Sequence, residues 1–78
     1  MTPEILGKIV LFHRKKSGLT QKQLAEMAGV GKTVVFDIEK GKATVQMNSL
    51  FRVLSVLNIM IELTSPLMKQ MEQHDEER

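Results

Sequence analysis

The sequence predicts a small, mainly α domain of four to five helices, built around a helix-turn-helix and followed by one C-terminal β-strand. Three observations lead to this fold class. Apolar residues recur at helical spacing in several short stretches, and glycines separate these stretches. Near residue 59 the spacing changes to an alternation of apolar and polar residues, which is typical of a strand. With 78 residues, the chain is expected to form one domain.

The first helix is expected to begin at Pro3, because proline fits the first turn of a helix and Thr2 is a suitable N-cap. Its apolar face is broader than one small core requires and consists of Ile5, Leu6, Ile9, Val10, Phe12 and His13. The sequence KKSG at residues 15–18 ends this helix, with Gly18 in the C-terminal glycine position.

The second helix has an unusually complete start signal. Thr20 and Gln23 match a capping box, and Leu19 and Leu24 occupy the two positions of a hydrophobic staple. The predicted helix covers residues 21–28. Its inner face consists of Leu24, Ala25 and Ala28.

The third helix follows after one tight turn. Gly29 breaks the second helix, residues 32–40 are again helical in pattern, and Gly41 ends them. The inner positions of this third helix are Val35 and Ile38. Two short helices joined by a tight turn with glycine form a helix-turn-helix. In this interpretation Lys32 and Thr33 point outward, toward DNA phosphates and base edges.

The same turn contains Gly31, Lys32 and Thr33, which look like the end of a nucleotide-binding phosphate loop. That loop requires a second glycine five residues before Gly31, where this chain has Glu26. It also requires a strand before the glycines, whereas residues 20–29 have a helical pattern. The sequence therefore argues against an NTPase.

Residues 47–59 predict a fourth helix, with Asn58 as its left-handed stop. Its apolar face consists of Met47, Leu50, Leu54 and Leu57. Residues 59–64 then alternate apolar and polar side chains and predict a strand. One strand alone is not stable, and no second strand is evident in the chain. We therefore expect this strand to pair with its copy in a homodimer, in which the dimerisation residues are Ile59, Ile61 and Leu63.

This organisation predicts a helix-turn-helix domain over residues 1–65 and an acidic, mobile tail over residues 66–78. Residues 1–45 carry eight Lys/Arg and four Asp/Glu, whereas residues 46–78 carry three and five. A basic front half favours a polyanionic partner, although ordinary solubilising charge explains it equally well.

Composition excludes several classes of site. The chain has no cysteine, so it has neither a disulfide framework nor a thiolate metal site. No apolar stretch is long enough to span a membrane, which predicts a protein of the cytoplasm without a membrane partner. His13 lies on an apolar helical face, where a packed or hydrogen-bonded histidine is expected. No arrangement of catalytic side chains stands out, so we expect no enzyme, no metal and no cofactor.

The stretch SGLTQKQLAEMAGVGKTVVFDIEKGK at residues 17–42 strongly resembles the Xre/lambda-repressor-like helix-turn-helix family. The matching positions are Leu19, Thr20, Gln21, Leu24, Ala25, Gly29, Val30, Val35, Ile38, Glu39 and Gly41. Together with Arg14 and the fourth helix, the resemblance covers about residues 5–58. The strand that follows makes the chain most similar to HipB-type antitoxins, which pair this strand with its copy in a dimer.

The resemblance implies roles for individual residues. The expected DNA-binding residues are Gln21, Gly31, Lys32, Thr33, Val34, Asp37 and Lys42. Gln21 would bind a DNA phosphate, while Gly31 replaces the usual Ser or Thr and so lacks a side-chain cap. Val34 contacts a thymine methyl group or is simply a tolerated surface valine. Arg14 and Glu39 would form a structural ion pair between the first and third helices, rather than two independent surface charges.

Two functions from different classes follow from the resemblance. The first is a sequence-specific repressor that binds a palindromic operator in double-stranded DNA as a homodimer, near the bacterial nucleoid. The second is a module whose main task is to inhibit a HipA-like kinase toxin. HipB-type antitoxins combine the two and regulate their own toxin-antitoxin operon. The alternative is a plain or phage-type Xre-family repressor without a toxin partner.

Overall fold

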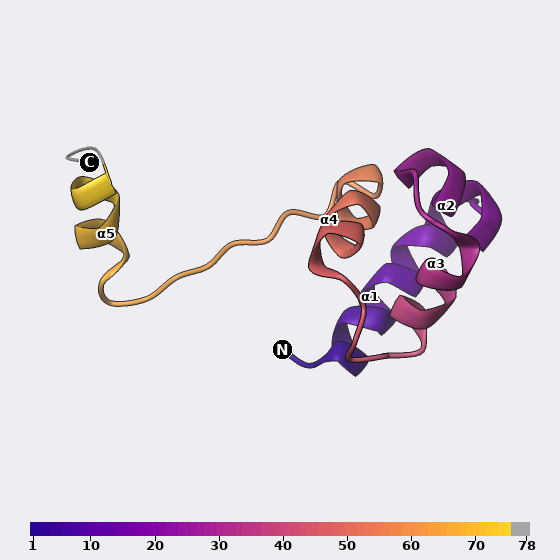
Figure 1. Ribbon diagram of the computed structural model, residues 1–78, viewed down its shortest axis with the longest axis horizontal. Helices are drawn as coiled ribbons and strands as arrows, with labels where there is room; N and C mark the ends of the chain where they lie inside the picture. The colour runs from indigo at the N-terminus through magenta and orange to yellow at the C-terminus, as the bar shows by residue number, and fades with distance from the viewer. Residues whose placement is uncertain (76–78) are drawn as a thin grey trace.

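A computed structural model describes residues 1–75 and contains five α-helices in this part of the chain. They are α1 (Pro3–Lys16), α2 (Gln21–Ala28), α3 (Lys32–Glu39), α4 (Met47–Val56) and α5 (Met68–Asp75). Helices α1 to α4 gather into one body, and the chain then leads away from this body to α5 (Figure 1). This arrangement is a mainly α helix-turn-helix fold, as the sequence predicts.

The helix starts follow from local hydrogen bonds. The Thr2 hydroxyl accepts a hydrogen bond from the Ile5 amide at 3.2 Å, and Pro3 opens α1. At α2, the Thr20 hydroxyl accepts from the Gln23 amide at 3.0 Å, and the Thr20 amide donates to the Gln23 side-chain carbonyl at 2.9 Å. The predicted capping box is therefore confirmed.

The tight turn between α2 and α3 depends on glycine. Gly29 ends α2 with φ 70°, in the left-handed region that glycine adopts without steric cost. Gly31 is the N-cap of α3 and, as expected from its missing side chain, makes no side-chain capping bond. Two short helices thus follow one another with only residues 29–31 between them, which is the helix-turn-helix.

One apolar core joins the first four helices. Its buried side chains are Val10, Leu24, Ala25, Ala28, Val35, Ile38, Val53, Leu54 and Leu57. Each fully buried large side chain stabilises the fold by about 1.5–3 kcal/mol relative to an exposed one. The inner positions predicted for α2 and α3 are all buried, whereas Val53, which has no exposed surface, was not among the predicted positions of α4.

Helix α1 approaches α3 closely at Gly7. The glycine is buried, and a Cβ atom there would meet the backbone carbonyl oxygen of Ile38 and lie 3.0 Å from that of Glu39. The contact is therefore between two backbones, and a side chain on Gly7 would separate the helices. The helical spacing of apolar residues does not predict this contact.

The C-terminal third differs most from the predictions. Helix α4 ends at Val56 rather than at residue 59, and Asn58 has the expected left-handed conformation, with φ 57°. Residues 59–64 form no strand within the described part of the single chain, because a ladder needs a partner strand that this part does not supply. The strand stays a prediction for a dimer.

The predicted mobile tail contains a helix that the sequence analysis missed. Helix α5 occupies Met68–Asp75, and the Ser65 carbonyl accepts a hydrogen bond from the Met68 amide at 3.2 Å just before it. Residues 76–78 of the predicted tail lie outside the described residues. None of the helices in residues 1–75 combines the length and the apolar character that a membrane crossing requires.

Candidate nucleic-acid interface

An ion pair fixes the third helix to the first. The Arg14 Nε donates to the Glu39 Oε2 at 2.6 Å, and the Arg14 Nη2 donates to the Glu39 Oε1 at 3.0 Å. The Arg14 and Glu39 side chains are only 12% and 5% exposed, respectively. The remaining guanidinium nitrogen, Nη1, donates to the Leu19 carbonyl at 2.9 Å. Hydrogen bonding to Glu39 raises the pKa of Arg14, because the carboxylate favours the charged guanidinium.

Gln21 belongs to the same network. Its side-chain amide donates to the Glu39 Oε1 at 3.0 Å, and Gln21 is half-buried. The carboxylate of Glu39 thus connects residues at the end of α1, the start of α2 and the end of α3. This network holds α3 at a fixed angle to the two preceding helices, which is what a recognition helix requires. The role of Gln21 in binding a DNA phosphate stays a prediction.

The outward side of α3 begins with polar, accessible residues. Lys32 and Thr33 are exposed in the first turn of the helix. Val34 is half-buried and packs against the core, so only part of its side chain is accessible. Val35 and Ile38 occupy the opposite side and anchor the helix in the core. The arrangement leaves the N-terminal turn of α3 free to enter a groove of DNA.

Asp37 and Lys42 form a second, more exposed ion pair beside this surface. The Lys42 Nζ lies 3.5 Å from the Asp37 Oδ2, and the two side chains are 55% and 24% exposed. The Lys42 amide also donates to the Asp37 carbonyl at 3.0 Å. Pairing of this kind partly neutralises Asp37, which as a free carboxylate would repel DNA. Sequence spacing alone did not indicate the pair.

The structure adds polar residues that the sequence analysis missed. A shallow hollow of about 190 Å³ adjoins α3, and its lining is Val34, Asp37, Lys42, Thr44, Val45, Gln46 and Ser49. Thr44, Gln46 and Ser49 come from the α3–α4 connection and from the first turn of α4. Hydroxyl and amide side chains are common phosphate ligands in protein–DNA complexes. They share a surface with α3 only because the chain folds back there.

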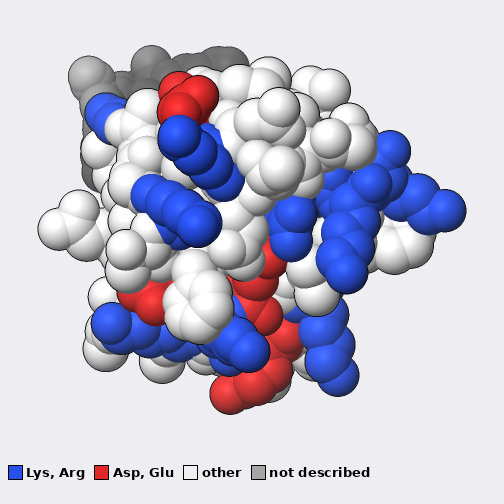
Figure 2. Space-filling model, turned by 90° about the vertical axis from the view of Figure 1, so that its right-hand side faces the viewer, with Lys and Arg blue, Asp and Glu red and all other residues white. Residues whose placement is uncertain are grey.

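Basic side chains surround the helix-turn-helix. Figure 2 shows Lys and Arg spread over the side of the molecule that carries α2 and α3, with Asp and Glu in smaller areas between them. Lys40 Nζ lies 5.5 Å from the centre of the Phe36 ring, which is 45% exposed. The Phe36 ring therefore supports a cation on this surface.

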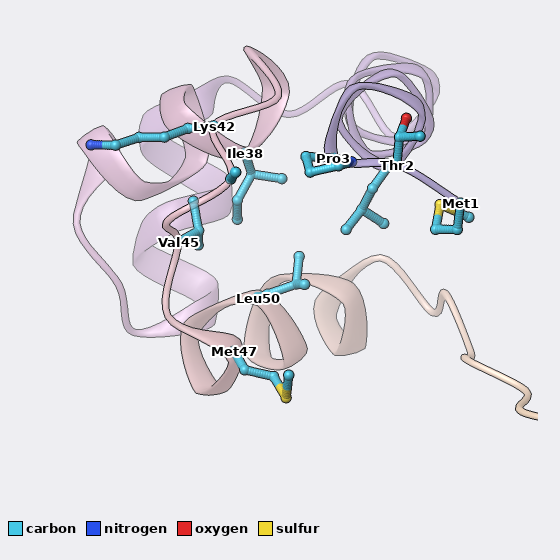
Figure 3. A pocket seen from close by; sticks show the side chains of 10 residues that line it. Met1, Thr2, Pro3, Ile38, Lys42, Val45, Met47 and Leu50 are labelled. Atoms are coloured by element: carbon cyan, nitrogen blue, oxygen red, sulfur yellow. The ribbon is translucent and has the colours of Figure 1, made fainter.

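A second hollow, of about 290 Å³, lies between the start of α1, the α3–α4 connection and α4. Its lining is Met1, Thr2, Pro3, Leu6, Ile38, Lys42, Ala43, Val45, Met47 and Leu50. Figure 3 shows that the Lys42 side chain points away from this hollow, which leaves mainly apolar groups inside it. Few polar groups converge there, so it lacks the features of a specific small-molecule site.

His13 has a structural role. Its Nδ1 hydrogen bonds with the Ile9 carbonyl at 2.7 Å, and its ring meets that of Phe12 edge to face. Within residues 1–75, His, Asp and Glu side chains do not form groups of three or more that could hold a metal ion.

Comparison with known proteins agrees with this geometry. The family model described as "Helix-turn-helix" (HTH_3) matches residues 13–62. A curated relative is the "Uncharacterized HTH-type transcriptional regulator y4mF" of Sinorhizobium fredii (strain NBRC 101917 / NGR234). It is 38% identical over 65 residues, which cover 83% of this chain and 86% of the relative.

Two solved structures share the fold. They are described as "Structure of HipA-HipB-O2-O3 complex" and "MDT Protein". Each aligns with a TM-score of 0.76 and 21% identity, over 85% of this chain and 93% of the other.

Proposed function

The chain belongs to the helix-turn-helix family, and we propose that this transcriptional regulator is a repressor that binds a palindromic DNA operator as a homodimer. The family is one of DNA-binding regulators and not a class of enzymes. The observation that carries the proposal is the placement of α3. Its inner side is locked by the core and by the Arg14–Glu39 pair, while its first turn presents Lys32 and Thr33 to solvent.

Lys32→Ala is expected to weaken operator binding. If Lys32 contacts a phosphate, its loss should reduce the slope of log affinity against log salt by about 0.9. If it reads a base, binding should weaken by about 1–3 kcal/mol and discrimination at that base pair should fall. Thr33→Ala is expected to behave in the second way. Fluorescence anisotropy with an operator duplex, titrated at several salt concentrations, measures both effects.

Lys69→Ala provides the matched control, because Lys69 is an exposed lysine on α5, outside the helix-turn-helix. This variant should keep the affinity and salt slope of the wild type. If operator binding were indifferent to salt and to both α3 substitutions, DNA recognition by α3 would be ruled out.

The dimer part of the proposal rests on exposed apolar surface after α4. Ile61 and Leu63 are 52% and 78% exposed, and Ile59 is half-buried against the core. They lie beside Phe51 and Leu54 of α4, in a hollow of about 430 Å³. Antiparallel pairing of residues 59–64 with the same residues of a second copy would cover these three apolar side chains and give the two segments backbone hydrogen-bond partners. The two recognition helices would then meet half-sites about 34–36 Å apart.

Ile61→Pro is expected to convert the dimer to a monomer, because proline removes a backbone donor in the middle of the paired segment. Ile61→Val keeps the donor and the strand propensity and should remain dimeric. Sedimentation at micromolar concentration distinguishes the two, and operator binding by Ile61→Pro should fall to half-site strength. A wild type that sediments as a monomer would contradict the dimer, whereas a dimer that survives Ile61→Pro would place the interface elsewhere, on Ile5, Ile9 and Phe12 of α1.

The antitoxin role is the finer part of the proposal. It is supported by the fold shared with a chain of the HipA-HipB-O2-O3 complex and by the likeness of the sequence to HipB-type antitoxins. The test is the gene neighbourhood: an adjacent gene for a kinase-like protein, whose product co-purifies with this chain and is silenced by it, supports the antitoxin. A regulator without such a neighbour would be a plain or phage-type repressor.

A further inference from the structure

Helix α5 has no function in the helix-turn-helix, yet it has one apolar side. Leu67 and Met71 are 63% and 56% exposed, and Met68 is half-buried. Leu67 directly precedes the helix. At about 100° per residue, Met68 and Met71 fall on one side of the helix, and Gln73 falls on the opposite side. An isolated helix of eight residues is not stable in water, since helices below about 12–15 residues are marginal. Helix α5 therefore needs a surface to pack against.

A matching surface exists on α4. Phe51 is 48% exposed, and it lines the hollow of about 430 Å³ together with Ser55 and residues 59–61. Arg52 is exposed in the next position of α4, and α4 carries no acidic residue. On α5, the exposed Glu72 flanks the apolar side. The two surfaces are thus complementary, with apolar groups at the centre and opposite charges at one edge.

We propose that α5 of each chain packs against α4 of a second copy, with Leu67, Met68 and Met71 over Phe51. This inference rests on the homodimer of the proposed function, because the strand pairing directs α5 to the partner. In antiparallel pairing of residues 59–64, residue 64 lies opposite residue 59 of the second copy. Four more residues, at about 3.3 Å each, bring the start of α5 alongside the partner's α4. Residues 59–65 already lead α5 away from its own α4 (Figure 1).

In this exchange of α5, the C-terminal segment of each chain holds the other chain in the dimer. The contact is isologous, so two copies of it form in one dimer. It covers apolar surface on both helices and would stabilise α5, which is too short to be stable alone in water. Because the paired strand directs α5 to the partner, Ile61→Pro should remove this contact together with the strand pairing.

Hydrogen exchange on the full chain tests whether α5 is docked. We expect the amides of residues 72–75 to exchange at least about tenfold more slowly in the wild type than in Met71→Glu, which places a charge in the contact. Gln73→Glu adds the same charge on the opposite side of α5 and should keep the protection. Sedimentation is run on the same samples. A dimeric wild type with unprotected α5 would overturn the inference and leave the proposed dimer intact, whereas a monomeric wild type would overturn both.

Disulfide trapping then identifies the chain on which α5 docks. The protein has no cysteine, so any disulfide that forms must join two introduced cysteines. Ser55→Cys/Met68→Cys keeps Phe51 and Met71 in place and should give a covalent dimer on oxidation. Ser55→Cys/Gln73→Cys is the matched control and should remain unlinked. A disulfide within single chains would show that α5 folds back on its own α4. If no disulfide forms and the α5 amides are unprotected, α5 does not dock on either chain. Either result contradicts the exchange.

Discussion

Arg14→Ala is expected to lower the free energy of unfolding by up to about 3–5 kcal/mol, the range for removing one partner of a fully buried ion pair, since the Arg14–Glu39 pair is largely but not completely buried. The Glu39 side chain is 5% exposed and accepts three side-chain hydrogen bonds, two from Arg14 and one from Gln21. The substitution removes both bonds from Arg14 and leaves only the one from the Gln21 amide. It also removes the donor to the Leu19 carbonyl. A domain of this size has only about 5–15 kcal/mol of stability in total, so the variant should melt far below the wild type.

Denaturant titration at one fixed protein concentration measures this change, since stability of a dimer depends on concentration. Lys42→Ala is the matched control: it removes a cation from an exposed pair, which is worth about 0–1 kcal/mol. Arg14→Met/Glu39→Leu should recover much of the loss, because no unpaired charge remains buried. An Arg14→Ala variant as stable as Lys42→Ala would show that the pair is solvated and does not hold α3.

Gly7→Ala is the second substitution with a large expected effect. The added methyl group would meet the backbone carbonyls of Ile38 and Glu39, which cannot move without shifting α3. Overpacking of this kind typically lowers the free energy of unfolding by about 1–3 kcal/mol. The upper end applies at Gly7, because the atoms that the methyl group meets belong to the backbone. Alanine regains about 1 kcal/mol through its higher helix propensity, so we expect a net loss of about 2 kcal/mol.

Operator binding should suffer along with stability, because the clash displaces the recognition helix itself. Thermal unfolding and anisotropy on the same sample measure both effects. Gly31→Ala is the control for stability alone, since a Cβ atom there meets nothing within 4 Å. Its cost should stay below about 1 kcal/mol and reflect only the weaker N-cap preference of alanine. A Gly7→Ala variant that matched this control in stability would show that α1 and α3 separate easily.

The local elements could be predicted from the sequence because their signals are local. The Thr2 cap, the Thr20–Gln23 capping box, the helix end at Gly29 and the left-handed Asn58 all depend on hydrogen bonds or dihedral angles within four residues. Helix α5 escaped prediction because its few apolar residues lie among polar ones near the end of the chain. The predicted strand is not formed in a single chain, because its hydrogen bonds require a second one.

The sequence by itself determined the helix-turn-helix, the inner sides of α2 and α3 and the lysines around them, since periodicity and glycine positions fix these features. The Arg14–Glu39 pair could be predicted only from a family resemblance. Its two residues lie 25 positions apart in the sequence, and no local pattern links them. Only the tertiary structure revealed the contact of Gly7 with α3, the Asp37–Lys42 pair and the placement of Thr44, Gln46 and Ser49 beside α3. These contacts depend on how the helices pack and on how the α3–α4 connection folds back, which is decided by the whole core and not by any one stretch of the chain.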